Sequence, residues 1–98
     1  MQIRFEPDAE ADLAEARVWY ERQRAGLDVA LMLRVDETLT RIVHSPYLYP
    51  IVHRQLRRAV LRQFPLAIFY DILGDEIRVF AVYHSSRDRK RLDSRIQP

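Results

Sequence analysis

Two neighbouring apolar segments in the last third of the chain constrain its fold most strongly. Residues 66–73 are apolar on both alternating faces, which is typical of a central strand, and residues 76–84 have the pattern of a second strand. The dipeptide Gly74-Asp75 between them suits a two-residue hairpin turn. Residues 57–61 would add a third strand to this meander. The pattern over 56–64 does not alternate cleanly, which predicts a bulge or a shifted boundary there.

The N-terminal part predicts a short strand followed by a helix. Residues 2–6 alternate between apolar and polar side chains, as a strand with one buried face does. We expect the first helix to cover residues 8–24, with Asp8 as its N-cap and Gly26 as its C-terminal stop. Trp19 and Tyr20 near its end are expected to pack in the core, because large aromatic side chains dominate cores.

A second helix should begin at Asp28, acting as N-cap, and end before Pro46. Glu37 and Arg41 lie four residues apart and should pair on its solvent side. Only three residues connect the two helices, so they must fold back on each other as an antiparallel hairpin. The apolar stripe of the second helix comprises Met32, Val35, Leu39 and Ile42.

Together these elements predict an α+β fold in a single domain over residues 1–98. Their order is β-α-α-β-β-β, with an antiparallel sheet that carries the helical hairpin on one face. Residues 47–50 would form a loop whose two tyrosines fold against the body of the protein. The basic C-terminal segment 85–98 would form a short helix, or a tail that orders only on binding.

Charge is distributed unevenly along the chain. The first fifty residues hold six arginines against nine acidic residues, whereas the remainder holds ten arginine or lysine residues against five acids. A basic half suits an acidic or anionic partner, because surface cations raise the local potential and steer association.

Several classes of protein are disfavoured by composition. The chain has no cysteine, so it can form neither a disulfide nor a thiolate metal site. His44, at a helix end, and His53, in an expected loop, have no carboxylate at ligand spacing, and we expect no metal and no cofactor. The apolar runs are far shorter than a membrane span, and residues 1–5 lack the apolar core of a signal peptide. We therefore expect a cytoplasmic protein that does not enter the membrane.

One candidate site lies where the last strand ends. Metal-free cleavage of RNA needs a group that takes a proton, a group that donates one, and cations that hold the phosphorane charge. His84 would act as acid or base, and Tyr83 would stack on a base. The cations around the phosphate would be Arg58, Arg62 and Arg87. The alternative is that His84 bonds its own loop and Arg87 pairs with an acid. The wider set of arginines that would bind a target or partner is Arg57, Arg58, Arg62, Arg87 and Arg91.

A series of short motifs occurs in a fixed order along the chain. The motifs are Ala11-Asp12-Leu13, Trp19-Tyr20-Glu21, Ser45-Pro46, Tyr49-Pro50, Arg58 through Phe64-Pro65, Tyr70, Ala81-Val82, and His84 with Arg87-Asp88. The series resembles the RelE/ParE superfamily of bacterial toxins, over roughly residues 3–90. The resemblance implies a toxin of a type II toxin–antitoxin module, held inactive by a cognate antitoxin.

The resemblance implies two alternative targets for such a toxin. Members of the superfamily either poison DNA gyrase or cleave messenger RNA on the ribosome, and the fold alone does not choose between them. Residues 89–98 lack the Tyr or His that nuclease members often carry near the C-terminus, so we expect the gyrase-poisoning, ParE-like branch. If the chain is instead an enzyme, it would be a metal-independent endoribonuclease that uses His84. A third alternative is a non-toxic module that only binds an antitoxin.

Overall fold

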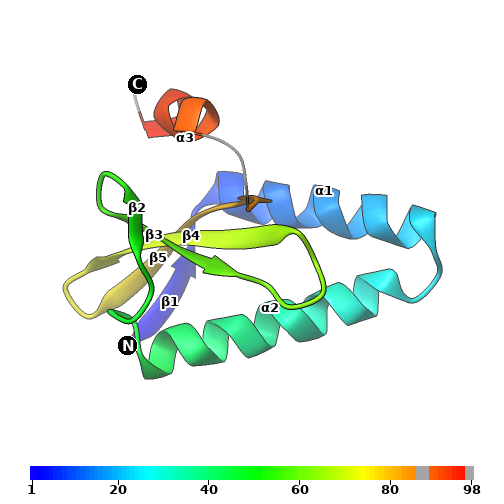
Figure 1. Cartoon of the computed structure of the whole chain (residues 1–98), viewed down its shortest axis with the longest axis horizontal. Helices are drawn as coiled ribbons and strands as arrows, with labels where there is room; N and C mark the ends of the chain where they lie inside the picture. The colour runs from blue at the N-terminus through cyan, green and yellow to red at the C-terminus, as the bar shows by residue number, and fades with distance from the viewer. Residues whose placement is uncertain (86–88, 97–98) are drawn as a thin grey trace.

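The computed structural model describes residues 1–85 and 89–96. It confirms the α+β class, the helical hairpin and the short basic C-terminal helix (Figure 1). The elements, in chain order, are β1 (Gln2–Phe5), α1 (Pro7–Gln23), α2 (Leu27–His44), β2 (Ile51–His53), β3 (Leu56–Val60), β4 (Leu66–Leu73), β5 (Glu76–His84) and α3 (Arg89–Ile96).

The five strands form one mixed sheet in the order β1-β5-β4-β3-β2. The meander β3-β4-β5 is antiparallel as predicted, and Gly74 adopts a positive φ of 61° in its turn. The prediction of a wholly antiparallel sheet was wrong for β1, which pairs in parallel with β5 from Gln2 opposite Glu76 to Phe5 opposite Val79. Two helices and three strands lie between β1 and β5 in the chain, and parallel neighbours require a long connection of this kind.

The edge strand β2 was not predicted. It contains three residues and pairs with β3 at only two positions, Ile51 opposite Arg57 and His53 opposite Leu56. A strand this short, directly after Pro50, has too little alternation to be recognised. His53, which we expected in a loop, therefore lies in the sheet.

Over 56–64, where a bulge or a shifted boundary was predicted, the register of β3 with β2 shifts between Ile51 and His53 and the strand ends early. β3 ends at Val60, and Gln63 in the following loop has a positive φ of 68°. Between β4 and β5 the register shifts, because Phe69 faces Ala81 while Tyr70 faces Val79. The extra residue of this bulge is therefore Phe80.

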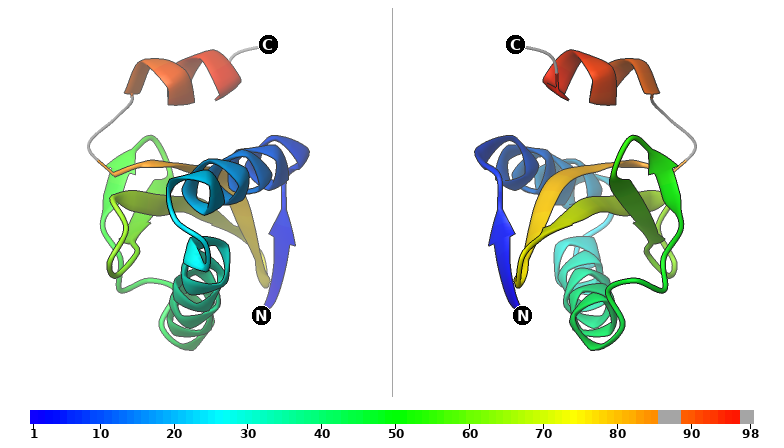
Figure 2. Two further views of the ribbon diagram at one scale, coloured as in Figure 1. Left: turned by 90° about the vertical axis from the view of Figure 1, so that its right-hand side faces the viewer. Right: turned by 90° about the vertical axis from the view of Figure 1, so that its left-hand side faces the viewer.

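Each face of the sheet is covered by its own apolar cluster. α1 and α2 pack on one face, where the buried side chains include Leu31, Val35, Ile42, Ile68, Tyr70 and Ile77. α3 covers the other face, and Figure 2 shows it on the side of the sheet away from α2. Full burial of a large aliphatic or aromatic side chain contributes about 1.5–3 kcal/mol, so both clusters stabilise the fold. The smaller cluster contains Leu56, Ala67, Phe69, Ala81, Tyr83 and Leu92.

Both helices begin one residue earlier than predicted. Pro7 is the first residue of α1 and Glu6 precedes it at the N-cap, so Asp8 lies in the first turn, where a negative charge is favourable to the helix dipole. α2 follows Gly26 at its N-cap, and Asp28 likewise lies in the first turn. The predictions of Asp8 and Asp28 as N-caps were therefore wrong, because each carboxylate lies inside its helix.

The aromatic residues divide between core and surface. Tyr20 is half-buried and its ring meets that of Phe64 edge to face at 5.0 Å. Trp19 was expected in the core, but its side chain is 56% exposed and lies at the surface beside the end of β5. In the loop after α2, Tyr49 packs against Tyr70 as predicted, whereas Tyr47 is exposed.

Tyr70 on β4 is expected to ionise at a higher pH than a free tyrosine does. Its ring is fully buried, its hydroxyl donates to the carbonyl of Pro46 at 2.7 Å, and burial raises its pKa to about 12. The unfolded chain releases this proton near pH 10, so the stabilisation is complete below about pH 10 and is lost as the pH rises towards 12. An ultraviolet titration of tyrosinate, compared with Tyr70→Phe, measures this. Five tyrosines that titrate together in the folded protein would contradict it.

Candidate functional site

The residues of the predicted site lie at one end of the sheet but on opposite faces. His84, the last residue of β5, pairs with Leu66, and Leu66 belongs to the cluster beneath the helical hairpin. Arg58 on β3 pairs with Phe69, which belongs to the cluster beneath α3. Directly paired residues share a face of a sheet, so His84 lies on the side of the helices and Arg58 on the side of α3.

His84 lines an open hollow of about 360 Å³ between α1 and the end of β5. Its side chain is exposed at this position. The walls combine aromatic rings with carboxylates, because α1 turns both kinds of side chain towards the strand. The other residues that line the hollow are Asp12, Glu15, Ala16, Trp19, Tyr20, Leu66, Val82 and Tyr83.

The adjacent arginines Arg57 and Arg58 make different contacts. Arg57 donates from Nη1 to the carbonyls of Tyr47 at 3.1 Å and Tyr49 at 2.6 Å, and its guanidinium lies 5.4 Å from the centre of the Tyr47 ring. It therefore holds the loop between α2 and β2 in place. Arg58 donates to the carbonyl of Ser85 at 3.3 Å, just beyond the end of β5. Their neighbouring positions on β3 direct them to opposite faces.

Arg62 is joined to α2. Its Nη1 lies 3.1 Å from Oε1 of Glu37, whose carboxylate also meets Arg34 at 3.3 Å and Arg41 at 3.6 Å. The predicted pair of Glu37 and Arg41 is therefore present, within a larger cluster. No pattern in the sequence predicted that Arg34 and Arg62 belong to this cluster, because Arg62 reaches α2 from the loop after β3.

Three predicted site residues need separate comment. Arg87 lies outside the described residues, and the side chain of Arg91 does as well. Tyr83 was expected to be available for stacking on a base, but it is buried and the guanidinium of Arg95 lies 4.7 Å from its ring centre. Its stacking partner is therefore internal, because α3 folds over this face of the sheet.

A largely buried ion pair connects α1, β5 and α3. Asp12 and Arg95 form a two-pronged pair, with Nη1 to Oδ2 at 2.8 Å and Nη2 to Oδ1 at 3.0 Å. Asp12 also accepts the backbone N–H of Val82 at 3.0 Å, and Arg95 donates to the carbonyl of Phe80 at 3.2 Å. β1 pairs with residues 76–79 of β5. Beyond that point the two side chains take its place and form hydrogen bonds with backbone groups at the edge of β5. The hydrogen bond to Asp12 raises the pKa of Arg95.

A second contact fixes α3 to the rest of the molecule. His53 Nε2 on β2 lies 2.7 Å from Asp93 Oδ1 on α3, and Arg54 is 3.8 Å from the same oxygen. α3 is thus held at one point by Arg95 and at another by Asp93. Both contacts join residues far apart in sequence, and no local pattern predicts them.

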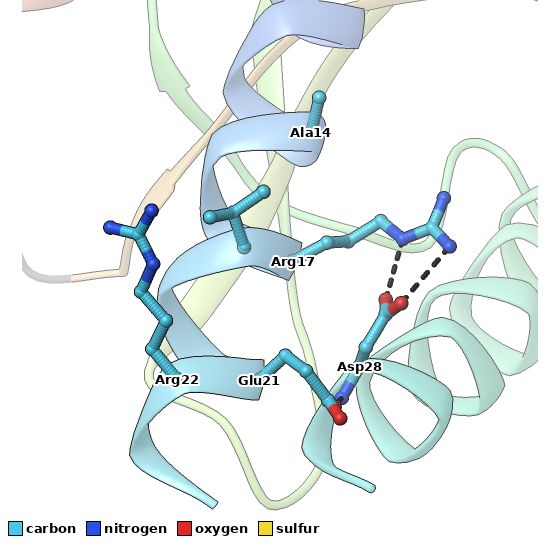
Figure 3. Close-up of a pocket in the computed structure, with 6 residues that line it drawn as sticks. Ala14, Arg17, Glu21, Arg22 and Asp28 are labelled. Carbon is cyan, nitrogen blue, oxygen red and sulfur yellow. Dashed lines mark hydrogen bonds and ion pairs between the residues drawn. The ribbon is translucent and has the colours of Figure 1, made fainter. Parts of the chain in front are cut away.

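Another hollow, of about 500 Å³, opens beside the turn between α1 and α2 (Figure 3). Its polar groups already stabilise the helical hairpin. Arg17 meets Asp28 at 2.5 and 3.2 Å, and Glu21 accepts the backbone N–H groups of Gly26 and Asp28. Glu21 thereby caps the start of α2 in place of the missing side chain of Gly26. The hydrogen bond from Arg17 lowers the pKa of Asp28.

The arginines of the predicted site are spread over both sides of the sheet, and this arrangement favours binding of a target or partner over a single catalytic centre. Arg58 is bonded to a backbone carbonyl on one face, and Arg62 is paired with a carboxylate on the other side of the sheet. Within residues 1–85 and 89–96, no three His, Cys, Asp or Glu side chains are grouped as metal ligands would be. In the same ranges, no helix is both long and apolar enough to span a bilayer.

Three solved structures are similar to this arrangement of sheet and helices. A chromosomal ParDE system from P. aeruginosa matches with a TM-score of 0.76 at 16% identity, covering 86% of this chain and 95% of that chain. The intact E. coli RelBE toxin–antitoxin complex matches with a TM-score of 0.64 at 13% identity, covering 88% of this chain and 98% of that chain. The isolated E. coli RelE toxin matches with a TM-score of 0.61 at 12% identity, covering 95% of this chain and 93% of that chain. The chain therefore shares the fold of these structures, as the resemblance of the ordered motifs predicted.

A family model places the chain more narrowly. The model for the ParE toxin of the type II toxin–antitoxin system parDE matches residues 3–89. This chain therefore belongs to the ParE toxin family. No curated protein matches it.

Proposed function

We propose that this protein arrests bacterial growth by poisoning DNA gyrase in the cytoplasm, and that a cognate antitoxin neutralises it. Membership of the ParE family supports the toxin part of the proposal. The placement of Arg58 and Arg62 supports the choice of target. A nuclease must hold its cations and its acid–base group around one phosphate, whereas these two arginines lie on different sides of the sheet.

The proposed antitoxin is an acidic, amphipathic segment that orders as it binds. Two of the similar structures are toxin–antitoxin systems, ParDE and RelBE, which supports a partner of this kind. The C-terminal half of the chain has the excess of basic residues that such a segment would complement. The product of a neighbouring small gene should co-purify with the toxin. A complex that persists at high salt would indicate apolar anchoring, because salt screens exposed charges.

Induction of the gene without its partner should stop growth, and the target then follows from two assays with purified toxin. We expect inhibition of gyrase in a supercoiling reaction and intact messages in a translating-ribosome reaction. Codon-phased cleavage of messages with active gyrase would establish the ribosome-dependent endoribonuclease instead. Unimpaired growth at high toxin levels, with the antitoxin complex still formed, would identify a non-toxic binding module.

His84 separates the two candidate activities. Its exposed position in the hollow beside α1 is the observation that favours a nuclease. For a gyrase poison we expect His84→Ala to change inhibition of supercoiling by no more than about two-fold, because the residue would lie at most at the rim of a protein contact. For a nuclease the same change would slow cleavage by about a hundred-fold or more, as loss of a general acid or base does. Arg22→Ala, on the exposed side of α1, is the matched control.

A further inference from the structure

The cluster around Glu37 has more positive than negative charge. Three arginines, Arg34, Arg41 and Arg62, meet the single carboxylate of Glu37, which leaves two positive charges without a partner in the cluster. We name this set the Glu37 arginine cluster. Asp36, the acidic residue directly before Glu37, lines a groove between α1 and α2 together with Leu13 and Arg17. It therefore faces away from the cluster.

The arginines of the cluster keep donors that Glu37 does not use. Among the described residues Arg62 makes one hydrogen bond, through Nη1, and its side chain is 59% exposed. Arg41 lies 3.6 Å from Oε2 of Glu37, which is an ion pair but too long for a hydrogen bond, and that oxygen has no hydrogen-bond partner among the described residues. A guanidinium has five N–H donors in a planar fork, so this cluster can accept a second oxyanion.

The surface next to the cluster indicates which kind of oxyanion fits. Val29, Leu33, Glu37 and Arg41 follow each other at intervals of four on α2 and so share one face of the helix. Leu33 is 62% exposed and Val29 is 65% exposed. A nucleic-acid backbone requires a continuous run of cations, whereas this ridge changes from cationic to aliphatic within one helical turn. A protein segment with acidic and apolar side chains matches both parts.

We propose that the Glu37 arginine cluster is a receptor for an Asp or Glu side chain of a protein partner, whose adjacent apolar residues lie on Leu33 and Val29. The incoming carboxylate takes the free donors of Arg41 and Arg62 and shares the positive charge with Glu37. This site adds a contact surface to the toxin, and it does not depend on gyrase as the target.

The test uses the full-length protein and two probes. One probe is a short synthetic peptide with Glu and Leu at helical spacing, and the other is a duplex DNA oligonucleotide. Arginine Nε–H resonances report binding site by site. We expect the peptide at low salt to shift the signals of Arg34, Arg41 and Arg62 in a saturable manner, and added salt to reverse this. Saturable shifts with the DNA and none with the peptide would overturn the proposal in favour of a phosphate site.

Two substitutions of opposite charge sign make the test specific. Arg62→Gln should weaken peptide binding about three-fold, as expected for a partly exposed charge pair, and Arg22→Gln on α1 should leave it unchanged. Glu37→Gln removes the competing carboxylate, so it should tighten binding about three-fold. A purely structural cluster predicts the reverse, since loss of Glu37 would disorder the arginines and weaken binding. Thermal unfolding of each variant verifies the fold, and Arg41→Gln replaces Glu37→Gln if the latter does not fold.

Discussion

Replacement of Asp12 by alanine should lower the free energy of unfolding by about 3 kcal/mol or more, because it leaves a buried cation without its partner. The side chains of Asp12 and Arg95 are only 10% and 17% exposed, so the charge that remains on Arg95 would be largely shielded from water. The substitution also deprives the backbone N–H of Val82 of its acceptor at the edge of β5. Urea denaturation monitored by circular dichroism gives the difference.

Asp8 provides the matched control for this prediction. It lies one helical turn before Asp12 on α1 and pairs with the same Arg95 at 3.6 Å, but its side chain is 68% exposed. Asp8→Ala should therefore cost less than about 1 kcal/mol, as other exposed ion pairs do. Equal losses for the two variants would show that burial is not what makes the Asp12–Arg95 pair important. A double variant that lacks both Asp12 and Arg95 should recover part of the loss.

Truncation of Leu31 to alanine should cost about 3–4 kcal/mol, because it creates a cavity under the helical hairpin. Leu31 is fully buried on the face of α2 that packs on the sheet. Leu33 is the same residue type on the same helix, but it is mostly exposed, and Leu33→Ala should change stability by no more than about 0.5 kcal/mol.

The pair of leucines tests the orientation of α2 directly. Thermal and urea unfolding of both variants suffice, since helix propensity changes equally at the two positions. A large loss at Leu33 with a small one at Leu31 would mean that α2 is rotated from the orientation described. Similar losses at both positions would mean that the outer face of α2 is covered in solution by another molecule.

The sequence predicted the elements whose signals are local. The hairpin of β4 and β5 followed from two apolar runs around Gly74-Asp75, and the helices followed from their periodicity and their short connection. The parallel pairing of β1 and the three-residue strand β2 were not predictable, because both depend on neighbours distant in sequence. Trp19 was misplaced for a related reason, since hydrophobicity alone does not say which face of a helix meets the sheet.

The candidate site was predictable in its residue types more than in its geometry. The basic composition around β3 identified Arg58 and Arg62, but the register of the strands separates Arg58 from His84, and a loop carries Arg62 to α2. The Asp12–Arg95 pair and the contact of His53 with Asp93 had no sequence signal, because each joins residues some forty or more positions apart. Their existence depends on α3 folding over the sheet.

The parallel partnership of β1 with β5 has a consequence for the synthesis of the protein. β1 precedes the helical hairpin in the chain, yet the described sheet pairs it with β5, which follows the other four strands. Until β5 has been made, β1 has no strand to join it to β4. Contacts between distant segments slow folding, so the sheet stays incomplete until β5 has been made. A shortened chain that stops before β5 would therefore be unable to build the toxin fold, and an interrupted message would yield a product for proteolysis.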